Sequence, residues 1–244
     1  MDILLVNAPY TVKIRPLCER IGLGYIAAVL RRNGYRVTIL DLPLMGMEIK
    51  KTVKHVRAGK YSLIGVSIPF EEEFPLALKL LRQLRKVDAG AHITVGGHFP
   101  TFAHASLLHD FNEIDSVVRG EGEYTMLNLA SALESRADLR TIPGLSFRED
   151  GNVAINPPRP LVENLDSLPF PARDTLVYSL RQDGVASVVG SRGCYGNCSF
   201  CSVNAFYRSA PGKSWRGRTT QNILSEIETL IEGWGVKEIG FEDD

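Results

Sequence analysis

The chain has 244 residues, of which 44% are hydrophobic and 23% are charged, and its 28 basic side chains are matched by 28 acidic ones. These proportions are typical of a globular protein and exclude a disordered or fibrous chain, while the formal net charge of zero argues against generic electrostatic binding to nucleic acid or to an acidic membrane. No apolar run approaches the ~20 residues that span a bilayer, and the first residues carry no basic leader, so we expect no membrane span, no signal peptide and a cytoplasmic location.

The first part of the chain alternates short apolar runs with amphipathic helical patterns. The expected strands are residues 3–6, 37–40, 63–68, 92–95 and 116–118, and the expected helices are residues 22–32, 47–57, 76–87, 102–109 and 124–133. Apolar strands separated by helices predict a parallel sheet that is covered on both faces. Because crossovers are right-handed, residues 1–140 are expected to form an α/β domain with a doubly wound five-stranded sheet of the flavodoxin-like or Rossmann-like type.

The pattern changes near residue 141. Residues 144–148 and 153–155 flank a Gly-containing turn and predict a β-hairpin, and the Pro-rich run that follows predicts a stiff, extended linker. We therefore treat residues 141–180 as a hairpin and connector. Residues 181–244 then contain an apolar strand at 186–190, a Gly-rich loop, a helix near 221–232 and the start of a strand at 238–242.

Three of the four cysteines lie within eight residues, directly after an apolar strand. Cys194, Cys198 and Cys201 have the spacing C-x3-C-x2-C, whereas Cys18 stands alone and is interpreted as an ordinary thiol. Thiolates this close together select zinc, copper or an iron–sulfur cluster. A structural zinc site uses four protein ligands, and the nearest histidine, His109, is remote in sequence. A 4Fe–4S cluster with one open iron is therefore favoured, with a zinc site completed by a partner ligand as the alternative.

This loop resembles that of the radical S-adenosylmethionine enzymes, whose signature has the same spacing and an aromatic residue before the third cysteine, here Phe200. The resemblance implies that the open iron holds the methionine moiety of S-adenosylmethionine, that reductive cleavage yields a 5′-deoxyadenosyl radical, and that an external donor of the flavodoxin or ferredoxin type supplies the electron. It also implies that residues 181–244 begin a (β/α) partial barrel. In that barrel Asp243 and Asp244, beside Glu242, would contact the amino group of S-adenosylmethionine, with an ordinary acidic loop as the alternative. Arg216 and Arg218 are interpreted either as solvated side chains or as functional ones.

Ligands of an open α/β sheet bind beyond the carboxyl ends of its strands. Those ends carry small or kinked residues, and the residues there that we take as candidate cofactor contacts are Asn7, Ala8, Pro9, Ser67, Ile68, Pro69, Gly96, Gly97, His98, Gly120, Glu121 and Gly122. No G-x-G-x-x-G follows the first strand, which argues against NAD or FAD. The carboxylate of Glu121 argues against a phosphate at that position.

Together with the cysteine loop, this domain resembles the cobalamin-binding domain of the cobalamin-dependent radical S-adenosylmethionine enzymes. The resemblance rests on residues 22–28, Ser67, residues 96–97, residues 119–123 and the connector residues 165–173. Cobalamin domains that supply a histidine to cobalt use D-x-H-x-x-G after the first strand, and residues 7–16 contain no histidine. The resemblance therefore implies cobalt without a histidine from that motif. His98 is either close to the corrin or an ordinary loop histidine.

The resemblance implies a cobalamin-dependent radical enzyme that transfers a methyl group to an unactivated centre of a small molecule, or that catalyses a related radical rearrangement or cyclisation. One alternative is a radical S-adenosylmethionine enzyme whose N-terminal sheet is structural or contacts substrate. Another is a module that binds the cofactors without turnover. A methylthiotransferase is disfavoured, because its N-terminal domain supplies three cysteines for a second cluster and this one has only Cys18.

The barrel implied by this resemblance is larger than the space between Val185 and Asp244, since each βα unit takes roughly 30 residues. We therefore expect the intact gene product to continue past Asp244. The 244-residue chain alone is expected to cleave S-adenosylmethionine slowly or not at all.

Overall fold

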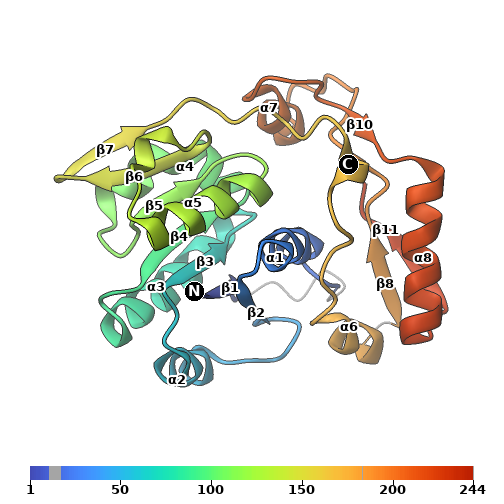
Figure 1. Cartoon of the computed structure of the whole chain (residues 1–244), viewed down its shortest axis with the longest axis horizontal. Helices are drawn as coiled ribbons and strands as arrows, with labels where there is room; N and C mark the ends of the chain where they lie inside the picture. Colours follow the sequence, from blue (N-terminus) through green and yellow to red (C-terminus); the bar gives the residue numbers. More distant parts are fainter. Residues whose placement is uncertain (11–17, 183, 244) are drawn as a thin grey trace.

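The computed structural model describes residues 1–10, 18–182 and 184–243. It has two parts joined by an extended connector, with a sheet domain on the left of Figure 1 and a smaller unit of strands and helices on the right. The first part contains β1 (Asp2–Asn7), α1 (Ile21–Arg32), β2 (Arg36–Asp41), α2 (Ile49–Gly59), β3 (Leu63–Ser67), α3 (Phe74–Val87), β4 (His92–Gly96), α4 (His98–Asp110), β5 (Ser116–Val118), α5 (Glu123–Ser135), β6 (Leu145–Glu149) and β7 (Asn152–Ile155).

The sheet of the first part has the order β2-β1-β3-β4-β5-β6-β7. Strands β1 to β5 pair in parallel, and their order is that of the flavodoxin-like doubly wound fold. Alternation along β1 explains the layers: Ile3 and Leu5 face α1 and α5, whereas Leu4 and Val6 belong to the core that includes residues of α2, α3 and α4. The predicted doubly wound α/β fold is confirmed.

The sheet has two strands more than the sequence predicted. The hairpin of β6 and β7, which we expected in the connector, pairs antiparallel with β5 and extends the sheet to seven strands. Phe147 of β6 is 2% exposed and packs in the core of α1 and α5. A local pattern predicts a hairpin but not its partner, and β5, with only three residues, offers the free edge that the hairpin covers.

Two helices begin earlier than expected because prolines lie in their first turns. Pro75 and Pro100 occupy positions where the missing backbone N–H has no intrahelical partner to lose. Gly97 precedes α4 with φ of +111°, a conformation that favours glycine. This places the start of α4 directly at the carboxyl end of β4.

The second part is built on two parallel strands. It contains α6 (Leu176–Gln182), β8 (Val185–Val188), β9 (Ser191–Arg192), α7 (Ser202–Arg208), β10 (Arg216–Gly217), α8 (Thr220–Trp234) and β11 (Glu238–Phe241). Strand β11 pairs with β8, and α8 packs on them through a small core that includes Ala186, Val188 and Leu230. Helix α8 begins where the side chain of Thr219 accepts a hydrogen bond from Asn222 N, and it ends at Gly235.

The connector runs along α1 and joins the two parts. Val162, Leu165 and Leu168 pack against Tyr25 and Val29 of α1. Ala172 N donates to Gly24 O, and a Cβ at Gly24 would lie 2.7 Å from Ala172 O, so glycine permits this close approach. Within the three described ranges, no helix is long and apolar enough to cross a membrane.

Candidate functional site between the sheet and the cysteine loop

A cavity of about 500 Å³ lies at the carboxyl ends of β3, β4 and β5. Its far wall comes from the second part, which contributes Val189, Ser191, Arg192, Phe206 and Tyr207, as well as Glu242 after β11. The volume is typical of a small-molecule site. Both parts of the chain are therefore needed to form one cavity.

Eight of the candidate cofactor contacts line this cavity: Ser67, Pro69, Gly96, Gly97, His98, Gly120, Glu121 and Gly122. The structure does not bring Asn7, Ala8, Pro9 or Ile68 to it. The Asn7 side chain turns away and donates to Asp41 Oδ1 at 2.9 Å, and Ala8 and Ile68 are fully buried in the core that packs against α3 and α4. Successive side chains at the end of a strand point to opposite faces of the sheet. The sequence alone does not show which of them point into the cavity.

Glycines shape the cavity. A Cβ at Gly65 would lie 3.1 Å from Leu5 Cδ2 and 3.2 Å from Met126 Cε, so glycine permits these side chains to pack closely on β3. Gly120 has φ of +69°, and a Cβ there would meet nothing within 4 Å. The cavity thus combines an apolar lining beside Gly65 with open space at Gly120.

His98 stands where the two parts meet. Its ring stacks on Phe206 of α7, with ring centroids 4.0 Å apart and an interplanar angle of 28°. His98 also lines the cavity. The histidine is therefore held by an aromatic side chain that follows the cysteine loop, beside the place where a ligand would bind.

The cysteine loop (residues 193–201) is fixed by its own backbone and by α7. Cys201 N donates to Cys198 O at 3.1 Å, and Asn204 Nδ2 donates to Gly196 O at 2.6 Å. A Cβ at Gly196 would lie 3.3 Å from Cys194 Sγ and 4.0 Å from Cys198 Sγ, so these two sulfur atoms flank the same glycine. All three cysteines are free, and Cys198 is exposed. Phe200 is 91% exposed and lies outside the cavity.

In the part of the chain that the structure describes, no three His, Cys, Asp or Glu side chains are gathered tightly enough to hold a metal ion. A four-iron cluster takes each thiolate on a different iron and so spreads its ligands more widely. Three free cysteines on an exposed loop fit such a cluster better than one ion.

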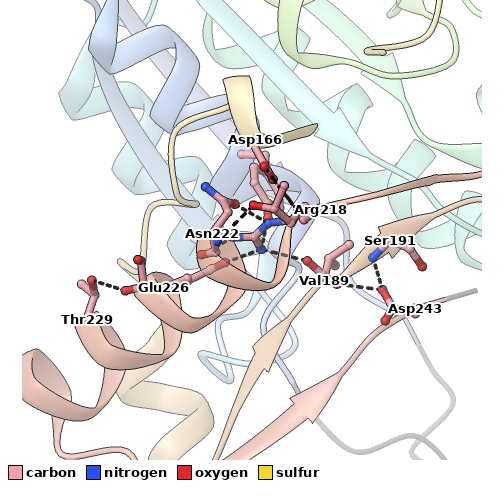
Figure 2. Close-up of polar contacts among 12 residues, drawn as sticks. Asp166, Val189, Ser191, Arg218, Asn222, Glu226, Thr229 and Asp243 are labelled. Carbon is pink, nitrogen blue, oxygen red and sulfur yellow. Dashed lines mark hydrogen bonds and ion pairs between the residues drawn. The ribbon is translucent and has the colours of Figure 1, made fainter. Parts of the chain in front are cut away.

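The two described acidic residues after β11, Glu242 and Asp243, have different contacts. Asp243 Oδ1 accepts hydrogen bonds from Gly190 N at 2.8 Å and Ser191 N at 2.6 Å, so this carboxylate fixes the turn after β8 (Figure 2). Glu242 accepts from Ser187 Oγ and lines the cavity. Asp244, the other predicted contact, lies outside the described residues.

Buried ion pairs join the two parts, and the sequence does not predict them. Arg192 donates to Glu121 Oε1 at 3.0 Å and to Glu123 Oε1 at 2.6 Å, and Arg216 Nη1 donates to Glu121 Oε2 at 3.0 Å. The side chain of Arg216 is 3% exposed, so it is not a solvated surface residue. Glu121 and Arg192 are 71 positions apart in the chain, and no local pattern signals such a pair.

A second buried network is formed by Arg173, Arg218 and Glu226. Arg173 of the connector donates to Glu19 and to Glu226, both at 2.7 Å. Figure 2 shows Arg218 between Glu226 and Val189, with donor distances of 2.5 Å to Glu226 Oε2 and 2.8 Å to Val189 O. Arg218 is therefore also structural rather than solvated.

The charges in the first network perturb one another. Burial acts against ionisation of Glu121, but Arg192 and Arg216 outweigh it and hold the pKa of Glu121 below its ordinary value. Burial likewise opposes the charge of Arg192, but Glu123 and Glu121 outweigh it and raise the pKa of Arg192. Burial raises the pKa of Tyr25, whose ring lies 5.0 Å from the Arg192 guanidinium, to about 12.

Comparison with known families decides the assignment. Residues 8–130 match the model of the B12 binding domain, which is half of the chain and includes strands β2 to β5. The chain belongs to the B12-binding domain family. The predicted resemblance to a cobalamin-binding domain is thereby confirmed.

Curated relatives extend over both parts of this B12-binding chain. An uncharacterized methyltransferase of Pyrococcus horikoshii is 32% identical over the whole chain, and an anaerobic magnesium-protoporphyrin IX monomethyl ester cyclase of Synechocystis is 31% identical over the whole chain. The aligned regions are 53% and 50% of these relatives. The chain therefore spans about half the length of the curated relatives it matches.

Solved structures share the fold of the whole chain. The cobalamin-dependent S-adenosylmethionine radical enzyme OxsB, solved with aqua-cobalamin and S-adenosylmethionine, matches with a TM-score of 0.84 and 24% identity over 100% of this chain and 34% of its own. The radical S-adenosylmethionine methyltransferase TsrM from Kitasatospora setae, solved with cobalamin and a 4Fe–4S cluster, matches with a TM-score of 0.79 and 22% identity over 100% of this chain and 47% of its own. The similarity includes the cysteine loop as well as the sheet.

Proposed function

We propose that the protein is a cobalamin-dependent radical S-adenosylmethionine enzyme that transfers a methyl group to an unactivated centre of a small molecule. The observation that carries this proposal is one cavity lined both by the strand ends of a B12-binding sheet and by residues that flank a C-x3-C-x2-C loop. The methyltransferase of Pyrococcus horikoshii among the relatives supports methyl transfer. Radical cyclisation is the second candidate, because a relative 31% identical over the whole chain is a cyclase.

The residues of the cavity suit cobalamin. Gly120, where a Cβ would meet nothing within 4 Å, leaves room for a flat ring at the strand ends, and Leu5, Gly65 and Met126 give the cavity an apolar lining along which an extended tail would lie. When bound, cobalamin supplies the methyl group to be transferred. His98 stacks on Phe206 at the cavity wall, and we propose that cobalt takes no histidine from the loop after β1.

Cys194, Cys198 and Cys201 would hold three irons of a 4Fe–4S cluster. When bound, the cluster supplies the electron that cleaves S-adenosylmethionine. Asn204 holds the loop at Gly196, and Arg208 Nη1 donates to Asn197 Oδ1 at 2.9 Å, so α7 keeps the three cysteines in one orientation. We also propose that Glu242, rather than Asp243, faces the amino group of S-adenosylmethionine, since Glu242 lines the cavity.

The proposal includes two further expectations. The exposure of Tyr195, Cys198 and Phe200 leaves the loop accessible to an external electron donor of the flavodoxin or ferredoxin type. The four free cysteines fit a reducing compartment, and we propose a cytoplasmic location.

Cofactor stoichiometry tests the proposal. After anaerobic reconstitution and equilibrium dialysis with hydroxocobalamin, we expect about one cobalamin, about four irons and about four sulfides per chain. Replacing the three cysteines by alanine should remove the iron and leave the cobalamin, because the two sites use different residues.

Three other outcomes of these measurements would contradict the proposed function, each in a different way. A cluster without cobalamin would favour a radical enzyme with a structural N-terminal sheet. Both cofactors without formation of 5′-deoxyadenosine by the complete gene product would favour a binding module. Tight zinc without iron would overturn the radical mechanism.

A further inference from the structure

The loop that carries the cysteines is closed at its base by two arginines. Strand β9 pairs antiparallel with β10, and this pairing sets Arg192 opposite Arg216. Between them the chain leaves at Gly193 and returns at Ser214. A Cβ at Gly193 would lie 1.8 Å from Ser214 O, so the two ends of the loop are in direct backbone contact. Residues 193–215 therefore project as one unit from a narrow base.

Both arginines at this base reach the same carboxylate in the B12-binding part. Glu121 Oε1 accepts from Arg192 at 3.0 Å, and Glu121 Oε2 accepts from Arg216 at 3.0 Å and from Val162 N at 2.7 Å. Glu123 adds a second carboxylate to Arg192 at 2.6 Å. The Glu121 side chain is 6% exposed. Arg216 Nη1 also donates to Glu121 Oε1 at 3.0 Å, so both arginines share this one carboxylate.

Glu121 also lies at the cofactor cavity. It lies between Gly120 and Gly122, and all three residues line that cavity. From the sequence we expect Glu121 to contact a cofactor. In the structure, both of its side-chain oxygens are directed to arginines of the second part and to the connector. A single residue therefore connects the wall of the cavity to the base of the cysteine loop.

The ion pairs of Glu121 are buried, and a buried ion pair affects stability differently from a surface pair. Removing one partner of a buried ion pair leaves an uncompensated charge and is strongly destabilising, whereas an exposed pair contributes little. Within the described ranges, loss of the Glu121 carboxylate would leave Val162 O as the remaining hydrogen-bond acceptor of Arg216. The loop base would then loosen locally, because residues 193–201 lie outside the apolar cluster that Phe206 and Tyr207 form with Leu161.

We propose that Glu121 is a positioning residue that fixes the cysteine loop against the cobalamin cavity and so sets the distance between the two cofactor sites. This inference rests on the proposed function for the identity of the cofactors. The anchoring of the loop rests only on the contacts of Glu121, Arg192 and Arg216.

Hydrogen–deuterium exchange of the cofactor-free chain tests the anchor directly. In the Glu121→Gln variant, we expect the amides of residues 193–215 to exchange about tenfold faster or more, while the amides of β1 and β3 keep their protection. Glu226→Gln is the matched control. It removes a carboxylate of similar burial from two ion pairs, with Arg173 and Arg218 rather than with Arg192 and Arg216, and it should loosen α8 instead.

The Arg192→Lys variant covers the case in which Glu121→Gln does not fold. Lysine keeps the charge but cannot span Glu121 and Glu123 as the forked guanidinium does, so a smaller increase in exchange is expected at residues 193–215. Unchanged exchange in that segment, or an equal increase in the Glu226→Gln control, would overturn the anchor.

A distance measurement tests the consequence for the cofactors. With both groups loaded into the protein, pulsed electron paramagnetic resonance between reduced cobalt and reduced cluster should give one narrow distance distribution, which broadens in Glu121→Gln and not in Glu226→Gln. An equally narrow distribution in Glu121→Gln contradicts the positioning role. If the unmodified protein binds neither cofactor, the proposed function fails, while the exchange experiment still decides whether Glu121 anchors the loop.

Discussion

Single glycines decide how close the backbone comes to a ligand or to another segment of this chain. Gly120 and Gly193 both have positive φ, but their surroundings differ. Gly120 faces open space in the cavity, whereas Gly193 is pressed against Ser214. Substitutions at the two positions therefore test the cofactor space and the loop base separately.

The first prediction concerns the cavity mouth. Gly120→Leu should weaken hydroxocobalamin binding by about tenfold or more, equal to ~1.4 kcal/mol, because its side chain enters the space of the ligand. Gly151→Leu is the control, since Gly151 also has positive φ and open surroundings but lies in the hairpin turn, so it carries the same backbone strain without reaching the cavity. Equilibrium dialysis compares the two, and equal affinities would show that cobalamin does not bind beside Gly120.

The second prediction concerns the loop base. Gly193→Ala should prevent incorporation of iron, because its Cβ would meet Ser214 O at 1.8 Å and force the loop apart. Gly34→Ala has comparable positive φ and no neighbour within 4 Å, so it should cost only ~1–2 kcal/mol of stability and leave iron content unchanged. Iron analysis after reconstitution measures the difference. Full iron loading in Gly193→Ala would mean that the close contact is not needed for the cluster.

At the scale of elements, the local pattern predicted the five parallel strands and their helices well. Apolar runs such as residues 3–6 and 63–68 are diagnostic because they are buried on both faces. The pairing of the hairpin with β5 was not predictable, since period and turn residues specify a hairpin but not its neighbour. The candidate site shows the same difference between local and distant features. The spacing of the cysteines is local and predicts the cluster loop, whereas the contacts of Glu121 join distant segments and have no local signal.

The hairpin should contribute directly to the stability of the B12-binding sheet. Phe147→Ala removes a side chain that is 2% exposed and should lower the free energy of unfolding by about 3–5 kcal/mol. Ile155→Ala in the same hairpin removes one that is 53% exposed and should cost less than about 0.5 kcal/mol. Chemical denaturation gives both values, and a small cost for Phe147→Ala would mean that the hairpin belongs to the connector.

The contact between the elements should weaken in acid. The pKa of Glu121 in the folded chain lies below its ordinary value of 4.5, so its stabilisation is complete above that pH and is lost as the pH falls through the folded pKa. The melting temperature of the unmodified chain should therefore exceed that of Glu121→Gln near neutral pH, with the difference shrinking below about pH 4.5. A difference that persists unchanged at lower pH would contradict this assignment of the charge.

At the scale of the whole molecule, the two parts are joined by charge as much as by apolar packing. Helix α1 and the connector lie between the sheet and the second part (Figure 1), and the buried networks around Glu121 and Glu226 tie them together. This arrangement gives one cavity two walls, one from the B12-binding sheet and one from the residues beside the cysteine loop. A methyl donor and a radical source could react with one substrate only if they meet in such a shared space.

The most direct test of this account is the electron paramagnetic resonance spectrum of the chain after anaerobic loading with iron, sulfide and hydroxocobalamin and reduction with dithionite. We predict two signals that persist through gel filtration: one from a reduced 4Fe–4S cluster, lost in Cys198→Ala and retained in Cys18→Ala, and one from reduced cobalt without coupling to a histidine nitrogen. Loss of the cobalt signal on gel filtration, coupling to an isotope-labelled imidazole nitrogen, or a cluster signal that survives Cys198→Ala would contradict the account.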